Sequence, residues 1–127
     1  MPKAPAADPA GPRLRIRLVF DDGLKIGPGK AELLEQIDRT GSISAAGRAM
    51  GMSYRRAWAL VEEMNRAFRA PLVLSSRGGT KGGGARLTGD GRTVLQAFRT
   101  LEQKMEQAGA TEIADITRLL SVPAPPK

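Results

Sequence analysis

The 127-residue sequence contains no cysteine and no histidine. Without cysteine it has no disulfide, no thiolate metal site and no cysteine nucleophile, and without histidine it lacks the commonest general base and metal ligand. We therefore expect no metal, no cofactor and no enzymatic activity, because Ser53 or Lys81 as a nucleophile would have no histidine partner. No apolar run reaches the roughly 18 residues of a membrane span, and residues 1–11 lack the apolar core of a secretory signal. A cytoplasmic protein without a membrane partner is expected.

Acidic residues are too few to balance the basic ones. The chain has 20 Lys and Arg against 13 Asp and Glu, a net charge of +7. Such an excess usually marks a partner that carries phosphates, or less often an anionic membrane. Seven basic and only two acidic residues lie between Ser53 and Arg86, so the excess is concentrated in about a quarter of the chain.

The order of the predicted elements indicates a single α+β domain. Residues 1–12 are rich in Pro and Ala and are expected to be a disordered tail, residues 13–108 to be folded, and residues 109–127 to be a short helix or a disordered tail. Alternating apolar residues from Leu14 to Phe20 predict a half-buried strand. The further predicted elements are a short strand at 24–26, helices starting near Pro28 and covering 44–50 and 53–70, strands at 72–76 and 85–87, and a helix at 88–108. This is the order of a winged helix-turn-helix domain with an N-terminal β-hairpin and a long C-terminal helix.

The spacing from Ala46 to Leu60 is the strongest signal in the chain. Two short helices that cross near a right angle need a small residue at the crossing and a turn residue that tolerates positive φ, and Gly47 and Gly51 stand four residues apart in these roles. The five core positions around Gly47 are all apolar: Ala46, Met50, Met52, Ala57 and Leu60. The alternative, an ordinary helical hairpin, would not require this glycine spacing.

The helix after this turn is the predicted recognition helix, with Ser53 as its N-cap. Arg55 and Arg56 lie in its first turn, where a guanidinium can bind guanine O6 and N7 in the major groove. Ser53 and Tyr54 are expected to reach phosphates or base edges, and the small Ala59 to allow close approach. The alternative for both arginines is a solvated face, and we assign Trp58 to packing.

The glycine-rich segment after residue 76 is the predicted wing. Its glycines increase the conformational entropy that the chain loses on folding. We therefore expect that they serve to let the backbone approach a ligand closely. Its basic residues would contact the DNA backbone; the alternative is a flexible hairpin tip. The wing residues are Gly78, Gly79, Gly82, Gly83 and Gly84, and the basic ones are Arg77, Lys81 and Arg86. Lys81 is followed by Gly82 rather than Ser or Thr, so a Walker-type nucleotide loop is excluded.

The long last helix carries an apolar seam with spacings of four and three residues: Val94, Phe98, Leu101, Met105 and Ala108. Such a seam suits a partner helix, and we expect Val94, Phe98, Leu101 and Met105 to form a homodimer interface. The alternative is that the seam packs on the first helix and hairpin of its own chain.

Three stretches together resemble the amino-terminal domain of the ModE family, molybdenum-responsive transcription regulators with a LysR-like winged helix. These stretches are Thr40 to Trp58, Glu63 to Asn65 and the glycine-rich segment to Thr88. The resemblance covers about residues 14–107 and implies a homodimer that binds a two-fold symmetric operator through recognition helix and wing.

One part of the family pattern is missing. Family members carry molybdate-binding modules with a Ser-Ala-Arg-Asn-type anion site, and residues 109–120 contain no such motif. We therefore expect a DNA-binding protein that does not bind molybdate. The alternatives are a winged-helix module that binds proteins and a DNA-binding protein without sequence specificity.

Overall fold

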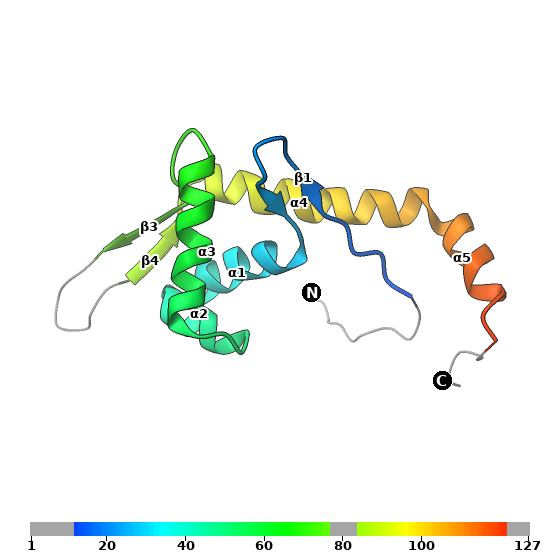
Figure 1. Cartoon of the computed structure of the whole chain (residues 1–127), viewed down its shortest axis with the longest axis horizontal. Coiled ribbons are helices and arrows are strands. Elements are labelled where there is room, and N and C mark those ends of the chain that lie inside the picture. Colours follow the sequence, from blue (N-terminus) through cyan, green and yellow to red (C-terminus); the bar gives the residue numbers. More distant parts are fainter. Residues whose placement is uncertain (1–11, 77–83, 122–127) are drawn as a thin grey trace.

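The computed structural model describes residues 12–76 and 84–121. The elements run β1 (Leu18–Val19), β2 (Lys25–Ile26), α1 (Pro28–Thr40), α2 (Ile43–Ala49), α3 (Tyr54–Ala67), β3 (Val73–Ser76), β4 (Gly84–Leu87), α4 (Gly89–Ala108) and α5 (Ala110–Arg118). Helices α1–α3 and the two hairpins gather at one end of the molecule, and α4 extends away from them to α5 (Figure 1). The predicted α+β class and the element order of a winged helix-turn-helix domain are confirmed.

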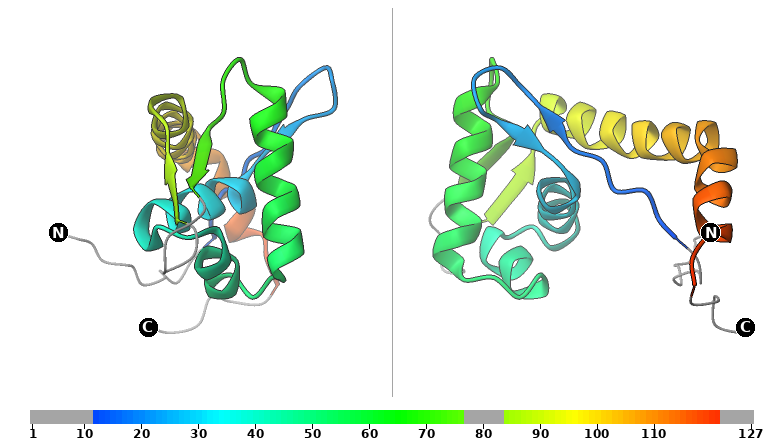
Figure 2. Two further views of the ribbon diagram at one scale, coloured as in Figure 1. Left: turned by 90° about the vertical axis from the view of Figure 1, so that its left-hand side faces the viewer. Right: turned by 45° about the vertical axis from the view of Figure 1, so that its right-hand side comes forward.

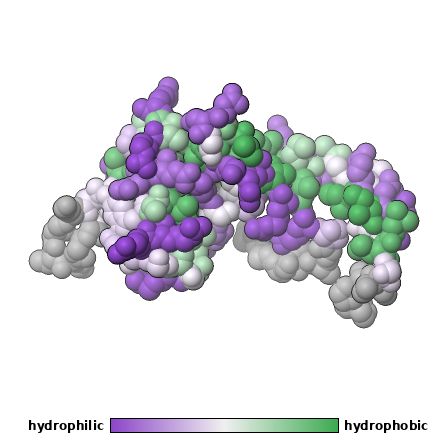
Figure 3. Space-filling model, viewed as in Figure 1, coloured by the Kyte–Doolittle hydropathy of each residue, from purple (hydrophilic) through white to green (hydrophobic). Residues whose placement is uncertain are grey.

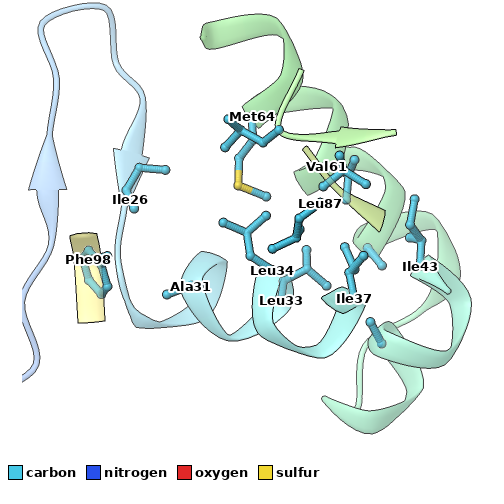
Figure 4. Packing of buried hydrophobic residues seen from close by; sticks show 14 of the residues in the cluster. Ile26, Ala31, Leu33, Leu34, Ile37, Ile43, Val61, Met64, Leu87 and Phe98 are labelled. Atoms are coloured by element: carbon cyan, nitrogen blue, oxygen red, sulfur yellow. The ribbon is translucent and has the colours of Figure 1, made fainter. Parts of the chain in front are cut away.

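Helix α1 is the centre of the core. Pro28 at its start fixes a helical φ, and Gly41 ends it in the left-handed conformation at φ 74°. Its side chains Leu33, Leu34 and Ile37 are fully buried. They lie among buried residues of α2, α3 and β4, while Ala31 near the start of the helix lies closer to Phe98 of α4 (Figure 4).

The first strand is much shorter than the alternation predicts. Leu14 and Ile16 are half-buried between exposed arginines, as expected, but only Leu18 and Val19 pair with β2. The prediction of a strand over residues 14–20 is therefore wrong in extent. The physical reason is the partner strand, which ends at Ile26 because α1 begins at Pro28, leaving residues 12–17 nothing to pair with.

Helix α3 also ends earlier than predicted, at Ala67 rather than residue 70. Phe68 already has an extended backbone (φ −98°, ψ 164°). The chain thus turns before Pro71, and this early turn carries Leu72 and Val73 into the core at the start of β3.

The β3–β4 hairpin is attached to the core at its base. Its register pairs Val73 with Leu87 and Ser76 with Gly84. The amide of Ala85 donates to the carbonyl of Gly41 at 2.9 Å, so β4 is hydrogen-bonded to the residue that ends α1 as well as to β3. The hairpin and α3 lie side by side at the end of the molecule away from α5 (Figure 2). The predicted tail over residues 1–12, Pro12 excepted, lies outside the described residues.

Candidate nucleic-acid interface

The turn between α2 and α3 has the geometry that its glycines predict. A Cβ added to Gly47 would lie 3.0 Å from Ala57 Cβ, and Gly51 has φ +74°. The amide of Met52 closes the turn by donating to the carbonyl of Gly47 at 2.9 Å. Ala46 and Ala57 are buried, and the other three predicted positions, Met50, Met52 and Leu60, are half-buried against the core. The helix-turn-helix interpretation is confirmed.

Helix α3 has one core face and one solvent face. Ser53 caps the helix by accepting a hydrogen bond from the Arg56 amide at 3.1 Å. Ala57, Val61 and Met64 are buried. The opposite face is exposed along the whole helix and consists of Arg55, Ala59, Glu62 and Arg66. The structure also exposes Ser53, Tyr54 and Arg56, so every predicted contact residue on α3 is accessible to solvent.

The arginines of this surface lack carboxylate partners. Among the described residues, the side chains of Arg55, Arg56 and Arg86 make no hydrogen bond or ion pair. By contrast, five arginines elsewhere in the described residues pair with carboxylates: Arg39, Arg69, Arg92, Arg99 and Arg118. Arg15 and Arg17 before β1, Lys25 on β2 and Lys104 on α4 are unpaired as well, but they lie outside the helix-turn-helix and the β3–β4 hairpin. The uncompensated positive charge of α3 and β4 is therefore available to an external anion.

The hairpin is held to α3 by Asn65, which the sequence analysis did not place in any site. Its Oδ1 accepts hydrogen bonds from the amides of Leu72 (2.9 Å) and Val73 (3.1 Å), and its Nδ2 donates to the Val73 carbonyl at 3.0 Å. The signal available in the sequence was that Asn65 is the only asparagine in the chain. These bonds set the position of the hairpin relative to the recognition helix.

The wing is only partly within the structure. Arg86 is exposed on β4, directly opposite Leu74 on β3. Gly84 is the first residue of β4, and a Cβ there would lie 3.5 Å from the Gly41 carbonyl oxygen, an ordinary contact distance, so packing does not require a glycine at this position. The remaining predicted wing residues lie outside the described residues: Arg77, Gly78, Gly79, Lys81, Gly82 and Gly83.

Two further exposed basic residues of the helix-turn-helix, Arg66 on α3 and Arg48 on α2, were not proposed as contacts. Arg66 is eleven positions after Arg55, which at 100° per residue brings it to within about 20° of the same helix face. Arg48 on α2 is exposed and its Nη1 donates to Ser44 Oγ at 3.0 Å, with no carboxylate partner among the described residues. The sequence feature that could have identified both residues is the one that identified Arg55, a basic residue on the polar face of a predicted helix.

Ion pairs fix the direction in which α4 leaves the core. Arg99 on α4 donates to Glu35 (2.6 Å) and Glu32 (3.3 Å) on α1, and to Glu102 one turn away (3.1 Å). Burial opposes the charged guanidinium, but the hydrogen bonds that it donates to Glu35 and Glu102 and the negative charges of these carboxylates outweigh burial and raise the pKa of Arg99. Near the start of α4, the hydrogen bond and charge of Arg69 lower the pKa of Asp90.

The apolar seam of α4 is divided between the core and the surface. Phe98 is 3% exposed and belongs to the core of its own chain, so its assignment to a dimer interface is wrong in this structure. The reason is that Phe98 faces α1 and β2, as Figure 4 shows. Val94 and Leu101 are half-buried, whereas Met105 is 44% exposed on the projecting part of α4.

Other kinds of site find no support in the part of the chain that the structure describes. Residues 12–76 and 84–121 contain no group of three His, Cys, Asp or Glu side chains arranged to hold a metal ion. Within the same ranges, no helix has the length and apolar character that crossing a bilayer requires.

Comparison with known proteins gives the family. Residues 29–92, about half of the chain, match the model of the bacterial regulatory helix-turn-helix proteins of the lysR family. The chain belongs to this family. The matched range runs from the start of α1 to the start of α4 and so contains the helix-turn-helix and the β3–β4 hairpin.

Several curated relatives carry the names that the sequence resemblance predicts. The molybdenum-pterin-binding protein MopB of Rhodobacter capsulatus is 45% identical over 63% of this chain and 30% of its own length. The molybdenum transport protein ModE of Azotobacter vinelandii is 37% identical over 74% of this chain and 35% of its own. The DNA-binding transcriptional dual regulator ModE of Escherichia coli K12 is 38% identical over 73% and 36%. The chain thus spans about a third of the length of these relatives, and the ModE-like, LysR-like character of its helix-turn-helix domain is confirmed.

Proposed function

We propose that this chain binds duplex DNA in a sequence-specific manner, as a homodimer, and regulates transcription. The observation that carries the proposal is the set of unpaired arginines on the exposed face of a helix that directly follows a helix-turn-helix turn. Its relatives support it, since several are named as transcriptional regulators and one as DNA-binding.

The first turn of α3 is the part that enters the major groove. Arg55 and Arg56 are the candidates for bidentate contacts to guanine, while Ser53 and Tyr54 are the candidates for contacts to phosphates or base edges. Ala59 leaves room for close approach one turn later. Glu62, exposed on the same face, would be repelled by phosphates, so insertion is limited to the first two turns.

The β3–β4 hairpin provides the second contact. Arg86 is exposed on β4 and is unpaired among the described residues, and the predicted contacts Arg77 and Lys81 follow from the sequence. Because these are cations near a polyanion, their contribution is to affinity and salt dependence rather than to base preference.

A second copy of the chain is the proposed partner of α4. The helix spans 20 residues, about 30 Å at 1.5 Å per residue, and its second half projects beyond the core (Figure 1). Apolar residues remain uncovered beside it: Leu18 and Phe20 of the first hairpin border a small groove that Val94 and Leu101 also line. Hydrophobic residues also gather on the surface over this region and over α5 (Figure 3). Because Phe98 is buried in its own chain, we place the centre of the proposed dimer interface on α4 at Leu101 and Met105.

A dimer would place two recognition helices on one face of the DNA. Half-sites read by such a pair lie about one helical turn, roughly 34 Å, or a multiple of it apart. The proposed operator is therefore an inverted repeat, as the two-fold symmetry of the protein requires.

Residues 1–127 are not proposed to bind molybdate. A tetrahedral oxyanion needs several donors that converge in a partly dry pocket. The unpaired arginines of α3 instead lie on an exposed helix face, and the basic wing alone would lose too much entropy on ordering around a small ion. Calorimetry with molybdate at micromolar protein should show no saturable heat, and a saturable isotherm would overturn this part of the proposal.

Footprinting on genomic fragments, followed by titration of the protected site, tests the proposal as a whole. Arg55→Ala or Arg56→Ala should weaken operator binding by roughly 1–3 kcal/mol and relax the preference at one base position. Lys81→Ala should weaken all sequences alike and reduce the salt slope by about one unit. Lys104→Ala removes the same charge from α4 and is the matched control. A chain that protects no fragment, or arginine variants that bind like the wild type, would refute the interface.

A further inference from the structure

The indole of Trp58 carries an unexplained polar group. Its Nε1 is buried without a hydrogen-bond partner, and it is the one side-chain nitrogen or oxygen in this state among the residues that the structure describes. An indole N–H can only donate, and a buried donor without an acceptor has a free-energy cost. Native proteins keep few such groups, so this one calls for a physical explanation.

The geometry of α3 places this indole on the side of the helix that faces the hairpin. Trp58 precedes Asn65 by seven positions, which at 100° per residue leaves the two side chains about 20° apart around the helix. Asn65 hydrogen-bonds the backbone at the start of β3. Trp58 therefore lies on the flank of the recognition helix that faces the β3–β4 hairpin, about 60° around the helix from Arg55.

Tyr54 contacts Trp58 near the start of the helix. Its ring meets the Trp58 ring edge-on, with centroids 6.2 Å apart and planes at 73°. Tyr54 is nevertheless 58% exposed. The buried donor thus belongs to a ring that an exposed tyrosine contacts, in the first two turns of the helix that is proposed to enter DNA.

The dimensions of B-DNA indicate which acceptor would reach this flank. The major groove is about 12 Å wide, and a helix with its side chains is about 10–12 Å across. When such a helix is inserted, its leading face meets the base edges and its two flanks meet the groove walls, which are the phosphate backbones. A side chain on the flank is therefore placed for phosphate, and Arg55 on the leading face for bases.

We propose that Trp58 Nε1 donates a hydrogen bond to a DNA phosphate oxygen, and that the Tyr54 ring moves aside to admit it. This inference rests on the proposed function and adds a contact residue that the sequence assigned to packing. The free protein keeps the donor unpaired, and binding supplies a charged acceptor, which makes the stronger class of hydrogen bond. Because the acceptor is a phosphate, the contact fixes the position of α3 without reading sequence.

Trp58→Phe is the direct test, because it keeps an aromatic ring and removes the N–H. We expect about a tenfold loss of affinity for operator and for unrelated duplex alike, since each 1.4 kcal/mol corresponds to tenfold. The salt slope should stay at the wild-type value, because a neutral donor releases no counterion, whereas Lys81→Ala changes it. The urea midpoint of Trp58→Phe is the control for lost packing, since a loss of affinity at unchanged stability cannot come from a damaged fold.

The single tryptophan of the chain permits a second test in the unaltered protein. A 15N-labelled sample gives one indole N–H signal, which should move downfield and become protected from hydrogen exchange when duplex DNA is added. Three outcomes would overturn the inference: Trp58→Phe binding like the wild type, a loss confined to the operator, or an indole signal unmoved in the complex. Failure of the wild-type protein to bind any duplex would instead refute the proposed function. The indole signal decides the question if Trp58→Phe does not fold.

Discussion

Replacing Gly91 by alanine should destabilise the protein at the joint that holds the hairpin to α4. A Cβ on Gly91 would lie 2.2 Å from the Leu72 carbonyl oxygen and 3.1 Å from its carbon. Both are backbone atoms, so no side chain can rotate away, and the two elements must separate by more than about 1 Å to restore ordinary contact. The same carbonyl accepts hydrogen bonds from the Thr88 amide (2.9 Å) and the Thr88 hydroxyl (3.2 Å), and both bonds weaken when the elements separate.

The expected cost follows from three contributions. Overpacking against an immobile backbone costs about 1–3 kcal/mol, and two weakened hydrogen bonds add about 1 kcal/mol each. Alanine recovers up to about 1 kcal/mol over glycine in a helix. The free energy of unfolding of Gly91→Ala should therefore fall by roughly 2–4 kcal/mol.

Urea denaturation followed by circular dichroism measures this change. Gly89→Ala is the matched control, because Gly89 lies in the same first turn and a Cβ there meets nothing within 4 Å. The control should change the free energy of unfolding by less than about 1 kcal/mol, in the stabilising direction. Equal stability of the two variants would refute the reasoning from close approach.

Three further predictions follow from single contacts. Gly47→Val should cost about 3 kcal/mol or more of folding free energy and abolish DNA binding, because its methyl groups would enter the space of Ala57, 3.0 Å from the added Cβ; a variant with wild-type stability and footprint would contradict the helix crossing. Asn65→Ala should lower the free energy of unfolding by roughly 2–4 kcal/mol, since it leaves two amides at the start of β3 without their acceptor; a variant with the wild-type midpoint in the same urea titration would contradict this role. Asp90→Asn should reduce the acid sensitivity of the fold: the pKa of Asp90 is lowered by Arg69, so its contribution is complete above the unfolded pKa and is lost as pH falls below about 4. The urea midpoint should therefore fall more in the wild type than in the variant when the pH is lowered from about 6 to about 3. The difference should be small because the pair is exposed, and an equal fall in both proteins would exclude this linkage.

The sequence by itself determined the helix-turn-helix and the ends of most elements. These depend on local chemistry: Gly47 and Gly51 meet steric and φ requirements within a few residues, and Ser53 and Thr88 cap the helices that follow them. Such requirements act over one or two turns of chain, so they are readable without knowing what packs where.

Only the tertiary structure decided which residues of a regular pattern are used, and how. The apolar seam of α4 keeps its alternating spacing of four and three residues along the helix. Nevertheless Phe98 is buried in its own chain and Met105 is exposed, because α1 and the first hairpin cover only the first half of the helix. The alternation over residues 14–20 gives a two-residue strand, because β2 is short. Asn65 and Trp58 lie on one flank of α3, but the first finds its acceptors and donors on β3 while the second finds none. Periodicity fixes the direction in which a side chain points, whereas the partner that it meets depends on contacts between residues far apart in the chain.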